Sequence, residues 1–357
     1  MPSIAVVNIY KKHEGVTAVA RSYLKALRRL GFEVTFYQCV EGDESDYDDE
    51  ATHIRGLKLP IRYIEKGINR AMVYPLKLKS IAEDLILLSD PWLLNTTFAR
   101  DNVIVLVHDL RLLTEFTENS AQTMIFRALL SRLNKTRHII SISETTKKSL
   151  VALGIEAAKI SVIPDSTEID VVGKEHQATS IKKILKGEPL NVVYVANDIP
   201  YKNARLFAEI AKGVSVTSVS KHFRFTLLSD IKRDTLQYSD STNLTVLRRV
   251  AEISGFYKDA DVLLFPSNYE GFGIPLIESM KSGIPIIAKQ IPTTQEVLDN
   301  GGEMLNTDNQ TAWISSLTKL YSIDKYTEMS ERALKRYQYF TEDRFLDRVK
   351  SVFSTFF

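Results

Sequence analysis

Short apolar runs alternate with amphipathic segments over most of the chain. The run at 3–10 (SIAVVNIY) is rich in β-branched residues and predicts a strand. Residues 16–30 place apolar side chains near helical spacing, Gly31 is suited to end that helix, and the run at 32–39 (FEVTFYQC) predicts a second strand. A strand, a helix and a strand in this order predict a parallel sheet that helices cover on its faces.

The rest of the first half continues this alternation. Each expected strand is short and apolar, and these strands lie at 83–89, 102–109, 138–143 and 160–165. A capped helix is expected at 143–154, with Ser143 as its N-cap and Gly154 as its stop. The apolar pattern is lost over residues 165–188, which we interpret as a linker between two domains.

The second half repeats the pattern of the first. Strands are expected at 190–197, 223–230, 244–250, 261–267 and 284–289, and the tail is mostly helical. The predicted fold class is α/β, with Rossmann-like domains at 1–167 and 185–337 and a C-terminal helix, at about 338–357, that packs back on the first domain. We expect the two domains to face each other across a cleft, with the ligand where the carboxyl ends of both sheets meet.

Composition supports a globular protein of two domains. The chain has 357 residues, more than the roughly 250–300 at which single cores stop growing. With 44% hydrophobic residues, 25% charged residues and a formal net charge of +2, nothing demands a nucleic acid partner. Cys39 is the single cysteine, which excludes an internal disulfide, and we expect it in the core. The amino-terminal run is unlike a signal peptide and no apolar run reaches membrane-spanning length, so we expect a cytoplasmic protein.

The stretch 269–285 (YEGFGIPLIESMKSGIP) is the strongest candidate for chemistry. It predicts a loop between a buried strand and a helix, where Gly271 and Gly273 allow the backbone to approach a ligand closely. A helix N-terminus favours phosphate, whereas the carboxylates of Glu270 and Glu278 repel it and are better suited to sugar hydroxyls. A plain loop in which Glu278 favours the helix dipole is the alternative interpretation of the same residues.

A longer stretch around this loop resembles a known family. Residues 265–288 (FPSNYEGFGIPLIESMKSGIPIIA) resemble the signature of retaining glycosyltransferases of the GT-B fold, the large glycogen-synthase-like and mannosyltransferase-like family often called family 4. Glu270 and Glu278 meet its E-x7-E motif. Other segments resemble the same family in the same order, namely HDL at 108–110, HIISISETTKKSL at 138–150, YVANDIPYKNARLF at 194–207 and FYKDADVLLFPS at 256–267.

The resemblance implies a role for each residue of the loop. Glu278 is expected to bind the ribose hydroxyls of a nucleotide, and Glu270 the hydroxyls of the donor sugar near the reacting centre. The backbone amides of Phe272, Gly273 and Ile274 are expected to hold the diphosphate. The resemblance also implies a role in polysaccharide or lipopolysaccharide biosynthesis. It implies a mannosyltransferase-like activity as well.

Four further candidate residues lie outside the loop, and two of them match the family pattern. Lys202 matches the lysine that neutralises the leaving diphosphate, and a cation there stabilises the developing charge. His108 matches a histidine over the donor sugar, which it touches through its ring or its carbonyl. Asn197 lies in the loop before Lys202, and Gly15 stands where the family usually has two adjacent glycines near the diphosphate.

The chain departs from the family pattern in three places, two of which are the single glycine at Gly15 and Asp165-Ser166 in place of Asn-Gly; the third is a missing cation. The family often has an arginine in the loop before the lysine, but residues 196–201 contain none. Arg205 and Arg248, with its neighbour Arg249, are the candidates to replace it.

The resemblance implies a retaining transfer of a hexose-type sugar from a nucleotide diphosphate sugar to a glycan or lipid-linked acceptor. In the front-side mechanism the departing phosphate oxygen accepts the acceptor's proton, so the protein supplies positioning and charge stabilisation. No metal or other cofactor is expected. The D-x-D at 46–48 lies in an acidic run, which we interpret as a solvated loop.

Two basic segments suggest contact with a membrane surface. Residues 53–80 hold seven lysines and arginines against one glutamate, with apolar residues between them, and 123–137 is a second basic amphipathic piece. Such surfaces attach to anionic headgroups, which favours a peripheral location at the inner face of the cell membrane. Ordinary helices with basic outer faces are the alternative.

Two other functions share these features. A GT-B-fold sugar-nucleotide epimerase uses the same fold and nucleotide but needs acid and base carboxylates. A non-catalytic nucleotide-sugar-binding homologue fits the missing arginine and the altered glycine loop. An NAD-dependent oxidoreductase is disfavoured because no G-x-G-x-x-G follows the first strand.

Overall fold

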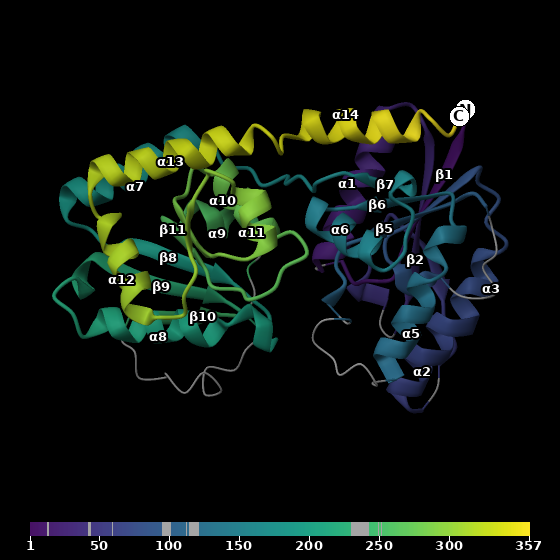
Figure 1. The fold of residues 1–357 in the computed structure, drawn as a ribbon, viewed down its shortest axis with the longest axis horizontal. Coiled ribbons are helices and arrows are strands. Elements are labelled where there is room, and N and C mark those ends of the chain that lie inside the picture. Colours follow the sequence, from purple (N-terminus) through teal and green to yellow (C-terminus); the bar gives the residue numbers. More distant parts are fainter. Residues whose placement is uncertain are drawn as a thin grey trace. The chain divides into compact units, whose positions relative to one another are not determined.

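The computed structural model divides the chain into two compact units (Figure 1). The structure describes residues 1–12, 14–41, 44–58, 60–94, 101–111, 113, 121–229, 243–248, 250 and 252–357. The first unit is formed by Met1–Ser166 together with Glu342–Phe357, and the second unit by Thr167–Thr341. The chain therefore leaves the first unit once and returns to it with its last helix.

The first unit is built on a parallel sheet of seven described strands. Its strand order is β3-β2-β1-β4-β5-β6-β7. The strands are β1 (Ser3–Asn8), β2 (Glu33–Val40), β3 (Thr52–Arg55), β4 (Leu85–Leu88), β5 (Val103–Val107), β6 (His138–Ser141) and β7 (Ile160–Val162). β1 is central, and its Ile4 pairs with Val34 on one side and Leu85 on the other. Every residue of β4 and β5 is buried, because helices cover both faces of a parallel sheet.

The last helix is held on the first unit by aromatic packing. Tyr23 of α1 is fully buried, and its ring lies 5.1 Å from that of Phe345 and 6.5 Å from that of Phe353 on α14. The helices of this unit are α1 (Gly15–Arg29), α2 (Arg62–Ile68), the π-helical turn η2 (Asn69–Val73), α3 (Tyr74–Leu78), α5 (Ala121–Leu130), α6 (Glu144–Ala152) and α14 (Glu342–Phe353). Short 3₁₀ turns are η1 (Glu44–Asp46), η3 (Pro91–Leu93), η4 (Leu133–Lys135) and η5 (Ala157–Lys159).

The second unit is built on a parallel sheet of six described strands in the order β10-β9-β8-β11-β12-β13. The strands are β8 (Leu190–Val195), β9 (Phe223–Leu228), β10 (Leu244–Leu247), β11 (Val262–Phe265), β12 (Ile286–Lys289) and β13 (Glu303–Leu305). The helices and 3₁₀ turns are α7 (Gly173–Lys186), η6 (Pro200–Lys202), α8 (Ala204–Ser215), η7 (Ser220–His222), α9 (Ile253–Lys258), α10 (Ile274–Lys281), α11 (Pro292–Leu298), α12 (Gln310–Lys319) and α13 (Ile323–Tyr337).

The expected linker at 165–188 is wrong over most of its length, because α7 occupies residues 173–186 and belongs to the second unit. The buried positions of α7 include His176, Gln177 and Ser180, and these polar side chains hide the hydrophobic periodicity of a helix. Ser180 and Lys183 both bind the carboxylate of Asp261, at 2.6 and 2.7 Å, so α7 packs through polar contacts. The second unit consequently begins at Thr167 rather than at 185.

The other differences concern short elements. The sequence analysis missed β3 and β13, which are edge strands of three or four residues with few buried positions. The helical tail is two helices, α13 and α14, which belong to different units. Cys39 is buried, as predicted. In the part of the chain that the structure describes, no helix has the length and apolar character needed to cross a bilayer.

Candidate functional site

The loop between β11 and α10 forms the centre of the candidate site in the second unit. Gly273 begins the turn into α10 with a φ of 96°, a backbone conformation that favours glycine. A Cβ at this position would also lie close to Leu276, 2.9 Å from its Cδ1. Phe272 is buried, and its ring centroid lies 5.8 Å from that of Phe340. Among the described residues, no hydrogen bond occupies the amides of Phe272, Gly273 and Ile274. The start of α10 therefore presents the arrangement of free N–H groups that binds anions.

Glu278 is the fifth residue of α10 and therefore lies in its second turn. This position removes the interpretation in which Glu278 only favours the helix dipole, since that effect is confined to the first turn. Its side chain is buried, and burial raises the pKa of its carboxyl to about 7, partly offset by the neighbouring Tyr257 hydroxyl.

Among the described residues, Glu278 has no ion pair, and its polar neighbour is Tyr257. The hydroxyl of Tyr257 lies near but does not reach hydrogen-bond geometry, and it has no other partner in the described structure. A buried carboxylate without a hydrogen bond costs several kcal/mol, so residues placed in this way are typical of ligand sites. Glu278 and Tyr257 are thus available to hydroxyl groups of a ligand.

Lys202 and Glu270 form an ion pair in this site. Lys202 Nζ lies 2.8 Å from each carboxylate oxygen of Glu270, and the two side chains are 16% and 7% exposed. Lys202 follows β8 and Glu270 follows β11, which are neighbouring strands, so both side chains come from the same edge of the sheet. The structure therefore brings together two residues that are 68 positions apart in the sequence.

Backbone contacts fix both members of this pair. The Tyr194 hydroxyl donates to the Lys202 carbonyl at 2.6 Å, and the Thr293 hydroxyl donates to the Glu270 carbonyl at 2.7 Å. Asn203 takes a left-handed conformation with a φ of 52°, which ends the turn that carries Lys202. The pair is accordingly part of a rigid scaffold and not a contact between two mobile surface chains.

The candidate cations of the second unit have other surroundings than this pair. Arg205 is 68% exposed on α8 and pairs with Glu209 at 3.0 Å. Arg248 is exposed directly after β10, two strands from β8, and Arg249 lies outside the described residues. Asn197 is exposed in the loop after β8.

In the first unit, His108 directly follows β5. Its Nε2 lies 2.8 Å from the Ser89 carbonyl, and because a carbonyl only accepts, Nε2 carries the proton. Burial lowers the pKa of His108, which favours a neutral ring whose Nδ1 is an acceptor. Gly15 is the first residue of α1 and is exposed.

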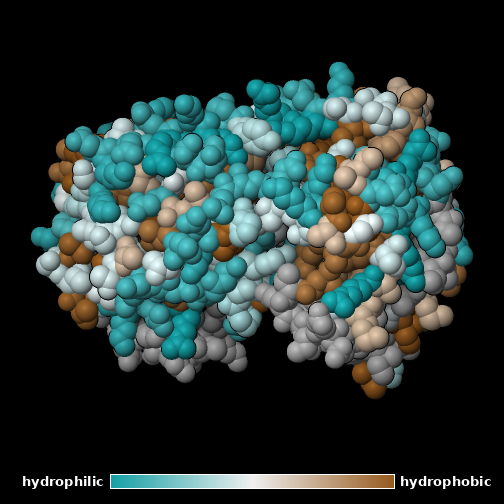
Figure 2. Space-filling view, in the orientation of Figure 1, coloured by the Kyte–Doolittle hydropathy of each residue, from teal (hydrophilic) through white to brown (hydrophobic). Residues whose placement is uncertain are grey.

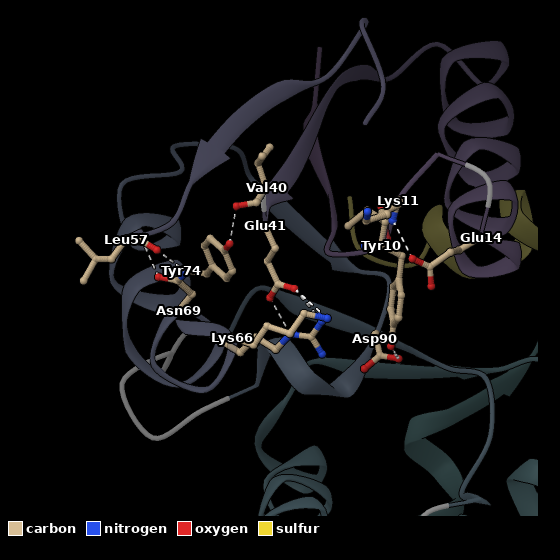
Figure 3. Close-up of polar contacts among 12 residues, drawn as sticks. Tyr10, Lys11, Glu14, Val40, Glu41, Leu57, Lys66, Asn69, Tyr74 and Asp90 are labelled. Carbon is tan, nitrogen blue, oxygen red and sulfur yellow. Dashed lines mark hydrogen bonds and ion pairs between the residues drawn. The ribbon is translucent and has the colours of Figure 1, made fainter. Parts of the chain in front are cut away.

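A polar cluster at the carboxyl edge of the same sheet was missed by the sequence analysis (Figure 3). The Tyr10 hydroxyl donates to Asp90 Oδ2 at 2.9 Å, and Arg70 binds Glu41 through Nε at 2.8 Å and Nη2 at 3.2 Å. Tyr10, Glu41 and Asp90 come within two residues of the ends of β1, β2 and β4, and open α/β sheets bind ligands at that edge, so the sequence could have indicated these three residues. Arg70 lies in a π-helical turn, and no sequence pattern indicated it.

The D-x-D at 46–48 is structural in this chain. Asp46 pairs with Lys11, Asp48 lies 2.5 Å from the guanidinium of Arg21, and Tyr47 is buried with its hydroxyl on the backbone of Glu41. It is therefore a folded turn and not the solvated loop that we expected. Over the described residues, no group of three or more His, Cys, Asp and Glu side chains is placed to hold a metal ion.

Two parallel α/β units, one with a glycine turn and buried carboxylates at its sheet edge, are characteristic of the GT-B class of glycosyltransferases. Residues 13–170 match the profile described as Glycosyltransferase Family 4, and residues 189–322 match the profile described as Glycosyl transferases group 1. The chain belongs to this family of glycosyltransferases, as predicted.

Curated relatives carry names from surface-polysaccharide synthesis. The chain is 26% identical over 245 residues to the O-antigen chain mannosyltransferase RfbU of Salmonella typhimurium, an alignment that covers 67% of this chain and 66% of that protein. It is 23% identical over 197 residues to an Escherichia coli UDP-Gal:alpha-D-GlcNAc-diphosphoundecaprenol alpha-1,3-galactosyltransferase, covering 52% of this chain and 51% of that protein. The chain thus matches between about half and two thirds of the length of these relatives.

Solved structures confirm the predicted GT-B fold. The sucrose-phosphate synthase of Thermosynechococcus elongatus has a TM-score of 0.76 at 15% identity and covers 99% of both chains. Anabaena HepE in complex with UDP and glucose has a TM-score of 0.76 at 14% identity, covering 99% of this chain and 100% of the other. WaaG, a glycosyltransferase of lipopolysaccharide biosynthesis, has a TM-score of 0.74 at 14% identity, covering 98% of both.

Proposed function

We propose that this protein is a retaining hexosyltransferase that moves a sugar from a nucleotide diphosphate sugar to a glycan or lipid-linked acceptor of O-antigen or lipopolysaccharide biosynthesis. The observation that carries the proposal is the Lys202–Glu270 ion pair beside a loop with free amides and the unpartnered Glu278. The names of the relatives RfbU and WaaG support the acceptor class.

Each part of the donor has a matching group in the second unit. The free amides of Phe272, Gly273 and Ile274 suit the diphosphate. Glu278 suits the ribose hydroxyls, whose hydrogen bonds compensate a carboxylate that is otherwise buried alone. The HepE complexes with UDP, glucose and UDP-glucose support a nucleotide-sugar donor.

Donor binding exchanges the partners of the ion pair. The diphosphate attracts the Lys202 ammonium, which is held by Glu270 in the structure, and the freed carboxylate accepts hydrogen bonds from the donor sugar. The positions of both groups are already fixed by their loops, so little reorganisation is needed.

Transfer then proceeds on one face of the sugar. The bond between the anomeric carbon and the diphosphate oxygen breaks, and the acceptor oxygen forms the new glycosidic bond on the same face. The acceptor's proton passes to the departing phosphate oxygen, whose charge Lys202 stabilises. Neutral His108, with Nδ1 as an acceptor, is suited to a hydroxyl of the donor sugar. We propose that no metal ion takes part, because a cation and three amides supply the charge that the leaving group needs.

Thermal unfolding with UDP, GDP, ADP, TDP and CMP, all in EDTA, tests the donor site. One diphosphate at 100 times its dissociation constant should add about 2.7 kcal/mol of stability and raise the unfolding midpoint. The shift should be lost in Glu278→Ala. Wild-type transfer kinetics in both Glu270→Ala and Glu278→Ala would contradict the assignment, and release of free sugar or an epimerised nucleotide sugar in place of transfer would favour an epimerase.

We propose in addition that the first unit contacts the inner face of the cell membrane. Apolar side chains are exposed on it, and apolar patches are visible in Figure 2. The exposed apolar residues of the first unit include Leu57, Ile61, Met72 and Leu76, and Met124 on α5. Exposed lysines close to the first four in the sequence are Lys58, Lys77 and Lys79. Such a combination suits anionic headgroups.

Sedimentation with vesicles tests this contact. Wild type should bind vesicles containing phosphatidylglycerol and not neutral ones, and changing the four apolar residues from Leu57 to Leu76 to serine should abolish binding. The matched control changes Leu185 and Val216, which are exposed apolar residues of the second unit, to serine and should bind as wild type. Equal binding to neutral and anionic vesicles would contradict the proposal.

A further inference from the structure

The polar cluster of the first unit has a built scaffold behind it. Asn8 is fully buried and bonds the Tyr10 carbonyl through Nδ2 at 3.0 Å and the Ser89 hydroxyl through Oδ1 at 2.9 Å. Gln38, also buried, donates to the same Tyr10 carbonyl at 2.9 Å. These contacts tie the residues after β1 to those after β4, so the Tyr10 and Asp90 side chains have fixed positions.

Asp90 is enclosed and yet accessible. Its Oδ1 accepts from the Trp92 amide at 2.8 Å and its Oδ2 from the Tyr10 hydroxyl at 2.9 Å. It is partly exposed, although the surrounding protein desolvates the carboxyl enough to raise its pKa to about 6. A ligand at this edge of the sheet can therefore still reach the remaining lone pairs of the carboxylate.

Arg70 lies in a π-helical turn that fixed contacts hold in place. Asn69, which is 1% exposed, clamps the backbone of Leu57 through both its amide atoms, at 2.7 and 2.9 Å, and so fixes the π-helical turn η2. The next residue, Arg70, is held by Glu41 through Nε and Nη2. Turns of this kind inside helices occur frequently at functional sites.

Arg70 lies within electrostatic range of the Asp90–Tyr10 pair and keeps a free donor group. Arg70 and Asp90 influence each other electrostatically, but none of the ion pairs among the described residues joins them. A guanidinium has five N–H donors, and two of its nitrogens are occupied by Glu41. The described contacts leave Nη1 of Arg70 unoccupied, and the carboxylate of Asp90 has acceptor capacity left.

The charges of the cluster select the kind of ligand. Asp90 and Asp109 interact electrostatically and add negative charge at the sheet edge. The cations Arg70 and Lys66 are both paired with Glu41, so the cluster favours a neutral ligand over a phosphate or carboxylate. Donors on Arg70, acceptors on Asp90 and the Tyr10 hydroxyl, which does both, complement adjacent hydroxyl groups that each donate and accept. Neutral sugars have this pattern.

We propose that Arg70, Asp90 and Tyr10 form a recognition subsite for a neutral acceptor sugar, in which vicinal hydroxyls bridge the Arg70 guanidinium and the Asp90 carboxylate. The inference rests on the proposed function, since it assigns the acceptor of that reaction. It makes Glu41 and Asn69 positioning residues that act through Arg70.

Sugar binding to the full-length protein tests the subsite. The probes are methyl glycosides of mannose, galactose, glucose and N-acetylglucosamine, with mannose 6-phosphate as the anionic comparison, and binding is followed by saturation-transfer NMR titration. At least one neutral glycoside should bind saturably. Asp90→Asn should weaken sugar binding roughly 10- to 100-fold. Arg70→Lys keeps the positive charge but loses the planar pair of guanidinium donors, so it should weaken sugar binding by a similar factor.

Controls separate this subsite from the rest of the molecule. Arg28→Lys alters an exposed arginine of the same unit and should bind as wild type. Tyr10→Phe removes a single hydroxyl of the subsite. If Arg70→Lys does not fold, sugar binding by Tyr10→Phe still tests the subsite. The nucleotide-induced shift of the unfolding midpoint, measured on the same samples, should be unchanged in every variant, because Glu278 and Lys202 belong to the other unit.

Three results would overturn the subsite. These are unchanged sugar binding in both Asp90→Asn and Tyr10→Phe, tighter binding of mannose 6-phosphate than of every neutral glycoside, and no saturable binding of any neutral glycoside to wild type. If nucleotide still raises the unfolding midpoint in any of these cases, the donor site of the proposed function is supported although the subsite is not. If nucleotide does not raise the midpoint of wild type, the proposed function itself is contradicted.

Discussion

Two desolvated carboxylates, one near the edge of each sheet, are held differently. In the first unit, Asp90 accepts hydrogen bonds from the Tyr10 hydroxyl and the Trp92 amide. In the second unit, the described contacts give the carboxylate of Glu278 no ion pair, whereas Glu270 in the same unit is paired with Lys202. Desolvation raises the pKa of Asp90 and of Glu278, and hydrogen bonds offset part of this cost at Asp90. We therefore expect removal of Glu278 to raise stability, and removal of Asp90 to raise it less or to lower it.

The largest effect is expected at Lys202, because it provides the charge that the departing phosphate requires. Lys202→Met should lower the transfer rate roughly 10²–10³-fold, as loss of a transition-state donor does in other enzymes. Glu270 then lies buried without its cation, so the unfolding midpoint should fall as well. Steady-state kinetics and a melting curve measure both effects.

The double variant sharpens this test. Adding Glu270→Gln to Lys202→Met removes the buried unpaired charge, so stability should recover while transfer stays low. Lys221→Met changes an exposed lysine of the same unit and should leave rate and stability unchanged. A recovery of transfer together with stability would mean that the pair is only structural.

The next effect concerns Glu278, where binding and stability should change in opposite directions. Burial raises the pKa of this carboxyl from 4.5 to about 7, a shift equivalent to an order-of-magnitude cost of about 3 kcal/mol for the ionised form. The proton bound to folded Glu278 stabilises the protein below pH 4.5, and this contribution is lost as pH rises through about 7. Glu278→Gln should therefore raise the melting midpoint most above pH 7, while nucleotide binding weakens roughly tenfold or more.

Asp90→Asn is the matched variant in the first unit. Burial raises the pKa of Asp90 to about 6, so removing its charge relieves a cost at pH 8, but an amide also loses part of the acceptor capacity that the Tyr10 hydroxyl and the Trp92 amide use. Asp90→Asn should therefore raise the unfolding midpoint less than Glu278→Gln does, or lower it. An equal or larger rise in Asp90→Asn would remove the distinction between the two carboxylates.

A smaller effect is expected from pH alone. If the ribose hydroxyls bind ionised Glu278, the dissociation constant of a nucleotide sugar should fall about tenfold from pH 6 to pH 8, because a carboxyl with a pKa of about 7 ionises in this window. A nucleotide sugar is preferred to a free nucleotide, since its phosphates do not titrate there. Calorimetry at five pH values measures the change. Glu278→Gln should give a flat profile, and an equally steep profile in this variant would assign the effect to another group.

The two edges also differ in how far the sequence predicted them. The donor loop is one continuous stretch, in which the strand, the glycine with positive φ and both glutamates follow within a few residues, so a local pattern identified it. The pairing of Lys202 with Glu270 was not predicted, because it depends on β8 and β11 being neighbours in a sheet whose order the sequence does not state.

The first-unit cluster and helix α7 show why other features were missed. Arg70 reaches Glu41 from a π-helical turn, which has no periodic signature, and the contact spans 29 positions. Helix α7 buries His176 and Ser180 against Lys183 and Asp261 in place of apolar residues, so hydrophobic periodicity could not detect it. Apolar patterns predict elements that pack by burial and fail where polar contacts do the packing.

The smallest effect compares one glycine from each unit. Gly154 ends α6 and Gly273 begins α10, with φ of 86° and 96°, a region that costs a residue with a side chain roughly 1–2 kcal/mol. A Cβ on Gly154 meets no atom within 4 Å, so Gly154→Ala should lower the melting midpoint by a few degrees and leave nucleotide binding unchanged. A Cβ on Gly273 lies 2.9 Å from Leu276 Cδ1, beside the amides proposed for the diphosphate, so Gly273→Ala should lower both the midpoint and the nucleotide-induced shift. Melting curves with and without nucleotide measure both quantities. If Gly273→Ala loses only stability, as Gly154→Ala is expected to, then the backbone at the start of α10 does not bind the diphosphate.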